Sequence, residues 1–148
     1  MFNIDIKKIR MESNKNQEET AKLLHISRSS YAMWESGNEI IPIKRLIDFS
    51  NIFNVSIDYI FKLNSKKYNK LSTYNKELSS TRLKEFRKEN KLTQEKLAKI
   101  LNTNKSVICG YEKGRYIIAT PFLYQICKKY NISADYLLGK IDNPKYLK

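Results

Sequence analysis

Two short stretches of the chain carry outward side chains of the kinds that contact the edges of nucleic-acid bases. In each stretch, larger apolar residues at helical spacing would point inward. The residues left outward are Arg28, Ser29, Ala32 and Met33 in one stretch and Lys105, Ser106, Cys109 and Gly110 in the other. Arginine and lysine can bond guanine O6 and N7, methionine can touch a thymine methyl, and serine suits base or phosphate. Both stretches are therefore candidate surfaces for entry into a major groove.

The two surfaces belong to a segment that repeats within the chain. QEETAKLLHISRSSYAMWESG at residues 17–37 recurs as QEKLAKILNTNKSVICGYEKG at residues 94–114. In each copy the apolar spacing predicts a short helix, a tight turn and a second short helix packed at a fixed angle. This arrangement is a helix-turn-helix, so DNA binding is the leading interpretation.

Both copies have the caps and turn residues that this interpretation requires. Residues able to accept bonds from the first backbone N–H groups of a helix stand at Asn16, Ser27, Thr93 and Asn104. The turn between the helices needs a positive φ, which His25 and Asn102 tolerate. We expect the paired helices at about 17–24 and 28–35, and at about 94–101 and 105–112.

Three more helices are expected in each copy. Their ranges are 3–13, 43–53 and a short helix after Ser56 in the first copy, and 80–90, 121–130 and a short helix after Ser133 in the second. Oppositely charged residues recur at matching positions, as Arg10 with Glu35 and as Arg87 with Glu112. We interpret both pairs as internal salt bridges that specify geometry more than they add stability.

The repeat defines the expected domain organisation. Residues 6–63 and 83–140 align without a gap and share 18 identities in 58 positions, which indicates a duplication. The prediction is an all-α protein with domains at 1–64 and 80–141, a polar basic linker at 65–79 and a loose tail at 142–148. Apolar residues at roughly helical spacing make an additional linker helix the alternative; these are Tyr68, Leu71, Tyr74 and Leu78.

Charge is unevenly distributed along the chain. The formal net charge is +13, made up of 9 Lys+Arg against 8 Asp+Glu in residues 1–64, 4 against 1 in 65–79, and 15 against 6 in 80–148. Such an excess favours polyanions through counterion release. The asymmetry predicts that the second half contributes more of the sequence-independent affinity for phosphate.

No pattern in the sequence indicates a metal site, a cofactor or a membrane span. Cys109 and Cys127 are not in a CxxC pair, and His25, the single histidine, has no ligand set around it, so we expect free thiols and a structural histidine. Catalytic constellations and glycine-rich phosphate loops are also missing from the pattern, which argues against an enzyme and against a small-molecule ligand. We expect a cytoplasmic, nucleoid-associated protein.

These features resemble one known family, the phage-repressor and Cro-like (Xre-type) helix-turn-helix domains. The resemblance covers residues 4–63 and 81–140. It rests on Gln17 and Gln94 at the start of the second helix, on Ala21 and Ala98, on ISRSSYAMWESG and TNKSVICGYEKG, and on the endings DYIF and DYLLG. The resemblance implies two tandem five-helix lambda-repressor-like DNA-binding domains.

The family also implies which residues meet DNA. Carried over by position, the base-reading residues would be Ser27, Arg28, Ser29 and Met33, with Asn104, Lys105, Ser106 and Gly110. The phosphate contacts would be Asn16, Gln17, Ser36 and Asn38, with Thr93, Gln94, Lys113 and Arg115. This chain departs from the family pattern because His25 and Asn102 replace the usual turn glycine, Tyr31 is bulky, and Gly110 brings no side chain.

The leading hypothesis is a sequence-specific regulator of transcription that binds double-stranded DNA, most simply a repressor. Because the two reading helices differ, the expected site has unlike halves, contacted by one chain as an intramolecular pseudo-dimer or by a homodimer. In the alternative, one domain holds DNA and the other binds a protein partner or dimerises, as in an antitoxin that represses its own promoter.

Overall fold

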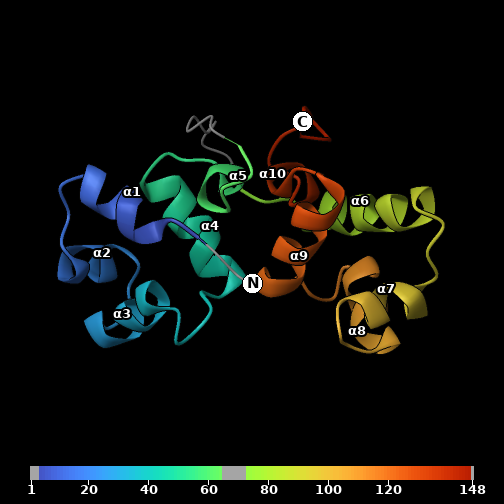
Figure 1. Ribbon diagram of the computed structural model, residues 1–148, viewed down its shortest axis with the longest axis horizontal. Coiled ribbons are helices and arrows are strands. Elements are labelled where there is room, and N and C mark those ends of the chain that lie inside the picture. Colours follow the sequence, from blue (N-terminus) through green and yellow to red (C-terminus); the bar gives the residue numbers. More distant parts are fainter. Residues whose placement is uncertain (1–3, 65–72, 148) are drawn as a thin grey trace. The chain divides into compact units, whose positions relative to one another are not determined.

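A computed structural model describes residues 4–64 and 73–147 of the chain, which divides into two compact units. The first unit is Met1–Ser72 and the second is Thr73–Lys148. Each contains five helices, and no strand occurs within the described ranges (Figure 1). The predicted all-α class and the two five-helix domains are confirmed.

The helices of the two units correspond in order. In the first unit they are α1 Ile6–Glu12, α2 Gln17–Leu23, α3 Arg28–Ser36, α4 Ile43–Ile52 and α5 Ile57–Ile60. In the second unit they are α6 Lys76–Glu89, α7 Gln94–Ile100, α8 Lys105–Glu112, α9 Thr120–Tyr130 and α10 Ala134–Leu137. The pairs α2–α3 and α7–α8 form the two helix-turn-helix motifs.

Local sequence signals account for the starts of these motifs. Asn16 and Glu19 form a reciprocal capping box at α2, and the side chains of Ser27, Thr93 and Asn104 accept bonds from the first turns of α3, α7 and α8. The turns contain His25 and Asn102, both at φ 59°. A positive φ at these two non-glycine residues confirms the expected turn geometry.

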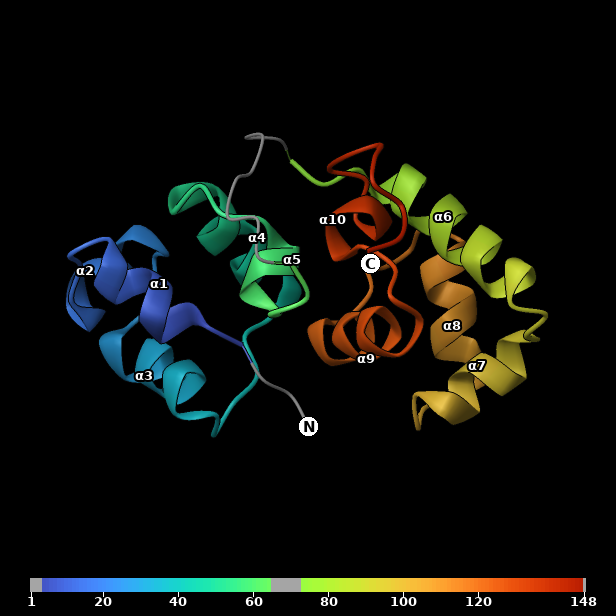
Figure 2. The same ribbon diagram turned by 45° about the horizontal axis from the view of Figure 1, so that its top comes forward.

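Each unit has its own apolar core. In the first unit Ile6 and Ile9 of α1 are buried together with Leu46 and Phe49 of α4 and with the end of α5. In the second unit α6 packs against α8 and α10 (Figures 1 and 2). Both helix-turn-helix motifs contribute to these cores, for example through Leu24 in the first unit and Leu101 in the second.

The helix at the start of the second unit is longer than its counterpart α1. It begins at Lys76, so the last residues of the expected linker, 76–79, are the first turn of α6. Asn75 caps this helix through its side chain, and the Asn75 N–H donates to the carbonyl of Leu138 at 2.9 Å. The remaining residues of the predicted linker, 65–72, including Tyr68 and Leu71, lie outside the described residues.

The expectation of a loose tail is wrong for residues 142–147. Lys145 O accepts from Ser133 N at 2.8 Å, and Leu147 N donates to Asn131 O at 2.6 Å. The side chains of Lys145 and Tyr146 both reach the carboxylate of Glu89 in α6, at 2.7 and 3.0 Å. The segment is held because it satisfies backbone groups at the start of α10 and buries Leu147.

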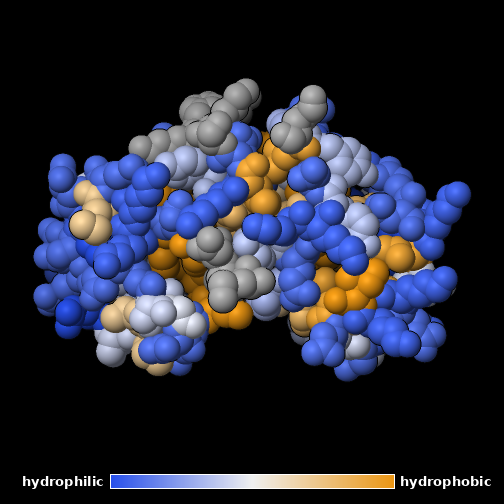
Figure 3. All heavy atoms as spheres, viewed as in Figure 1, coloured by the Kyte–Doolittle hydropathy of each residue, from blue (hydrophilic) through white to orange (hydrophobic). Residues whose placement is uncertain are grey.

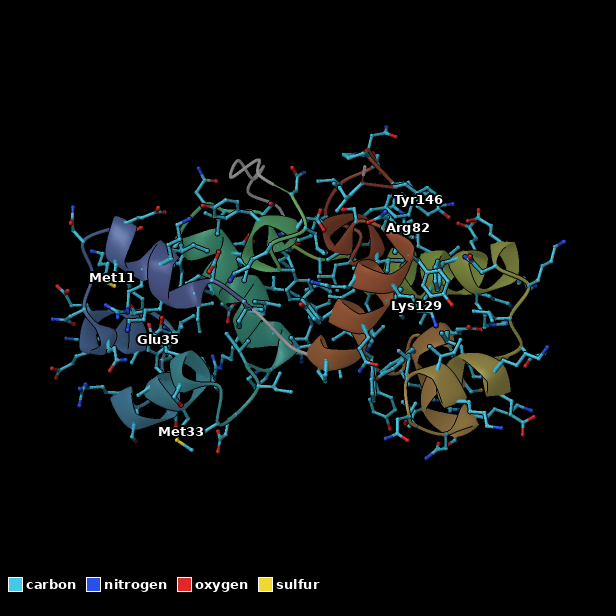
Figure 4. All side chains as sticks on the ribbon, viewed as in Figure 1. Met11, Met33, Glu35, Arg82, Lys129 and Tyr146 are labelled. Carbon is cyan, nitrogen blue, oxygen red and sulfur yellow. The ribbon has the colours of Figure 1, made fainter. Side chains whose placement is uncertain are left out.

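Arg82 fixes the beginning of this returning segment. Its guanidinium donates to the carbonyls of Tyr136 and Ile141, both at 2.7 Å, and to Asp142 at 2.9 Å. The group also stacks over the Tyr136 ring, 3.9 Å from its centroid. Figure 4 shows the labelled side chains of Arg82 and Tyr146 close to each other in the second unit.

Candidate nucleic-acid interface

The predicted reading helices, α3 and α8, are each anchored by two aromatic or aliphatic side chains one turn apart. Tyr31 and Trp34 are buried on α3, with their rings edge to face at 6.0 Å, and Ile108 and Tyr111 are buried on α8. Small residues on the partner helices, Ala21 and Ala98, are also buried and allow the two helices of each motif to approach closely. The opposite sides of α3 and α8 are therefore left outward.

Most of the expected base-reading residues lie on these outward sides. Seven of the eight are exposed, namely Ser27, Arg28, Ser29, Met33, Asn104, Lys105 and Ser106. Figure 4 shows Met33 projecting from α3 on the side opposite to Glu35, which points into the first unit. Gly110 differs from the rest of the set, because it is buried beneath the ring of Tyr116.

The expected phosphate contacts surround the same surfaces. Asn16, Ser36 and Asn38 are exposed in the first unit, as are Thr93, Lys113 and Arg115 in the second, while Gln17 and Gln94 are half-buried. Surface hollows of about 480 and 590 Å³ open at the two motifs. The first is lined by Arg10, Asn16, Gln17, Glu18 and Arg28.

The hollow of the second unit brings together residues from both helices of its motif. It is lined by Thr93, Glu95, Lys96, Ala98, Lys99, Thr103, Asn104 and Lys105. Lys96 and Lys99 were not among the residues expected to meet DNA, although their spacing of one turn on an exposed helix face is visible in the sequence. Three ammonium groups against the one carboxylate of Glu95 leave this hollow with a net positive charge, which attracts phosphate.

A buried ionic cluster recurs in both units and connects three helices. Arg10 Nε donates to Glu35 Oε2 at 2.6 Å and Arg10 Nη2 to Glu35 Oε1 at 3.1 Å, while Gln17 Nε2 donates to the same Oε1 at 3.0 Å. Arg10 Nη1 also donates to the carbonyl of Lys15 at 2.8 Å. The start of α2 and the end of α3 are thereby tied to α1.

The second unit repeats this cluster almost atom for atom. Arg87 donates to the two carboxylate oxygens of Glu112 at 2.6 and 3.0 Å, Gln94 donates to Oε1 at 3.0 Å, and Arg87 donates to the carbonyl of Leu92 at 2.8 Å. Only 3% of the Glu112 side chain is exposed. The amides of Gln17 and Gln94 thus already have one structural hydrogen bond each.

The cluster shifts the ionisation of its members. Burial alone would raise the pKa of Glu35, but hydrogen bonds from Arg10 and Gln17 outweigh it, and the pKa is lowered. The hydrogen bond to Glu35 raises the pKa of Arg10, and the bond to Glu112 raises that of Arg87. Arg10 and Glu35 therefore both stay charged at neutral pH, which keeps the bidentate geometry of this pair.

The two interfaces differ in charge. Residues 17–39 contain 2 Lys+Arg and 4 Asp+Glu, a net −2, whereas residues 94–116 contain 5 and 2, a net +3. Figure 3, which shows hydropathy and not charge, has pale and weakly apolar side chains together with hydrophilic ones over α3. The surface of the second motif therefore has the stronger electrostatic attraction for a polyanion.

No site for a metal ion is formed by the described residues, where no three His, Cys, Asp or Glu side chains gather. Cys109 and Cys127 form no disulfide bond. Each helix in the described ranges is too short or too polar to span a lipid bilayer.

Comparison with known proteins identifies the family. The profile of the helix-turn-helix domain matches residues 3–66 and matches again at residues 81–143. The chain belongs to the helix-turn-helix family. It carries two copies of the domain in tandem, so the resemblance seen in the sequence is confirmed.

Similar proteins bear the names of transcriptional regulators. The uncharacterized HTH-type transcriptional regulator YqaE of Bacillus subtilis (strain 168) is 39% identical over 62 residues, 42% of this chain and 53% of that protein. YobD, described in the same words and from the same organism, is 38% identical over 63 residues, 43% of this chain and 56% of that protein. The chain spans about half the length of these two relatives.

A shorter relative comes from an archaeon. An uncharacterized HTH-type transcriptional regulator of Archaeoglobus fulgidus is 39% identical over 55 residues, which are 37% of this chain and 78% of that protein. No solved structure matches the chain. The family is thus one of DNA-binding regulators.

Proposed function

We propose that this protein is a sequence-specific transcriptional repressor that places α3 and α8 in the major groove of double-stranded DNA. The observation that carries the proposal is that the two units keep one framework, down to the ionic cluster, while their outward residues differ. A framework that is repeated with a changed surface is what recognition of two unlike half-sites requires. A regulator that covers a promoter in this way blocks polymerase without further domains.

Base reading is assigned to side chains by their chemistry. Arg28 and Lys105 stand at equivalent positions at the start of α3 and α8 and are both exposed. Each can donate to O6 and N7 of guanine, and Met33 can contact a thymine methyl. Lys113 and Arg115 at the end of α8 provide phosphate contacts that set the register without reading sequence.

The test begins with selection of binding sites from random DNA by the full chain. We expect a site with two unlike halves, and a promoter carrying that site should be repressed in a reporter assay. Arg28→Ala and Lys105→Ala should each weaken binding by about 5- to 150-fold, the equivalent of losing one base contact, with relaxed preference in one half only.

Matched controls are available on the first helix of each unit. Lys7 and Lys84 occupy equivalent exposed positions on α1 and α6, which are not the proposed reading helices. Lys7→Ala and Lys84→Ala remove the same charge and should leave the base preference unchanged. A symmetric selected site that needs only one unit would refute the two-half-site proposal.

A second function for the first unit is favoured by its charge. Its interface carries a net −2 and exposes Leu23, Met33 and Ile40, which suits a protein partner or dimerisation better than it suits DNA. In that case the second unit alone would hold the promoter. Loss of affinity from Lys105→Ala but not from Arg28→Ala would support this division.

A further inference from the structure

An exposed aromatic side chain stands next to the reading helix of the second unit. Tyr116 follows α8 and is 65% exposed, more than any other large apolar side chain of the described residues. It comes directly after Arg115, and the backbone N–H of Arg115 donates to the carbonyl of Gly110 at 3.0 Å. This bond ties the segment after α8 back onto the helix.

The ring of Tyr116 occupies the space that a side chain at position 110 would fill. A Cβ added to Gly110 would lie 3.0 Å from Cδ2 and 3.2 Å from Cε2 of Tyr116, closer than ordinary van der Waals contact. Gly110 is buried for this reason, although it falls on the outward side of α8, opposite the buried Ile108 and Tyr111. The absence of a Cβ allows the ring to lie directly on the helix.

The first unit fills the same place by other means. The counterpart of Gly110 is Met33, whose own side chain is 36% exposed and whose Sδ lies 4.0 Å from Asn38 Nδ2. The counterpart of Tyr116 is Glu39. An apolar group therefore stands at this point of both reading surfaces, as a methionine from α3 in one and as a tyrosine ring from the segment after α8 in the other.

We propose that Tyr116 is a base-reading residue of the second unit and contacts the C5-methyl group of a thymine in the major groove. The proposal rests on the proposed function, in which α8 enters that groove. Apolar contact with this methyl is the major-groove feature that an aromatic ring can recognise. A tyrosine provides a large contact with few rotatable bonds, and the ring is already held against α8 before DNA binds.

The test pairs protein variants with DNA variants. Each thymine of the selected site is replaced in turn by deoxyuridine, which removes only the methyl group, and affinity is measured for the full chain. We expect one replacement in the half-site of the second unit to weaken wild-type binding by about fourfold, as for one buried methyl group. The same replacement should have no effect on Tyr116→Ala, while Tyr116→Phe should behave as the wild type.

A second variant tests the placement of the ring. Gly110→Ala leaves Tyr116 in the chain but introduces a Cβ 3.0 Å from the ring, so the ring must move and the same thymine dependence should weaken. Circular dichroism and melting of the two Tyr116 variants should match the wild type because Tyr116 is exposed, and circular dichroism of Gly110→Ala checks that α8 is retained. If Tyr116→Ala keeps the deoxyuridine profile of the wild type, the inference is wrong. A wild type without sequence preference would instead reject the proposed function itself.

Discussion

At the scale of single residues, the ionic cluster determines how the reading helix is presented. One carboxylate, Glu35 or Glu112, accepts hydrogen bonds from an arginine of the first helix and from a glutamine at the start of the second. Buried ion pairs add little net stability, but they require one geometry. The cluster therefore fixes the angle between the two helices of the motif, while residues such as Arg28 and Lys105 are free to differ.

Glu35 should make the first unit sensitive to acid. Its pKa in the folded unit lies below the ordinary value of 4.5. The stabilisation is thus fully present above about pH 4.5 and is lost as the pH falls through the lowered value. Glu35→Gln should lower the free energy of unfolding by on the order of 3 kcal/mol at pH 7 and should weaken its dependence on pH below 5.

Trp34 makes this prediction measurable in the intact protein. It is the single tryptophan of the chain and is buried next to Glu35 in the first unit, so its fluorescence follows the unfolding of that unit. Denaturant titrations at pH 7 and pH 4 compare the wild type with Glu35→Gln. Glu39→Gln, a change at an exposed residue, is the control; an equal loss in both variants would contradict the prediction.

Residue predictions from sequence succeeded where local chemistry decides the outcome. His25 and Asn102 take the positive φ that their residue types allow, and the residues expected outward on α3 are exposed or half-exposed. Gly110 could not be foreseen as buried, because the ring that covers it comes from beyond the helix. Lys91 adopts φ 56° in the turn before α7, and a lysine gives no signal for that conformation.

At the scale of elements, glycine is required at the ends of two helices for different reasons. Gly37 ends α3 at φ 82°, and a Cβ there would have nothing within 4 Å. Gly139 follows α10 at φ 75°, but a Cβ there would lie 2.9 Å from both Cβ and O of Asn75. One glycine is required by backbone conformation alone, and the other is also required by the close approach of the chain that leads into α6.

Alanine at these two positions should therefore have unequal effects. Gly37→Ala should destabilise the first unit by about 1–2 kcal/mol, the cost of a left-handed conformation. Gly139→Ala should destabilise the second unit by more, because Asn75 must move and the Asn75–Leu138 hydrogen bond is strained. Thermal melting, monitored by circular dichroism, tests whether Gly139→Ala is the more destabilising change. Equal losses of stability in the two variants would show that the contact with Asn75 is easily relaxed.

The elements missed from the sequence lie at the edges of the repeat. The first turn of α6 and the returning segment 142–147 lie outside the aligned residues 6–63 and 83–140, so the alignment carried no information on them. Their placement depends on contacts distant in sequence, such as Arg82 with Asp142 and Lys145 with Glu89. Apolar periodicity and caps predict helices, but they do not predict such contacts.

At the scale of the whole molecule, duplication has given two frameworks with different electrostatic character. The fold was predictable because the core positions, caps and ionic cluster repeat in register along the sequence. The division of affinity between the units is a separate property. It depends on exposed charges that diverged, most clearly Ser36 and Asn38 in the first unit against Lys113 and Arg115 in the second.

Exchange of these four residues should move salt dependence from one unit to the other. Log affinity falls with log salt, and each phosphate contact that is lost makes this negative slope less steep by about 0.9. Lys113→Ser with Arg115→Asn should therefore make it less steep by about 1.8. The reverse exchange, Ser36→Lys with Asn38→Arg, should make the slope steeper by about the same amount if the first unit lies on DNA. Binding titrations at several salt concentrations on the selected site measure both.

The two exchanges together decide what the first unit does. All four positions are exposed, so the folded units should tolerate the changes, and Lys84→Ala controls for loss of charge away from the interface. If the salt dependence becomes weaker with the first exchange and stronger with the second, both units lie on DNA at once. A slope that responds only to the exchange in the second unit would mean that the first unit is off the DNA, because charges added to a surface that meets no phosphate release no counterions.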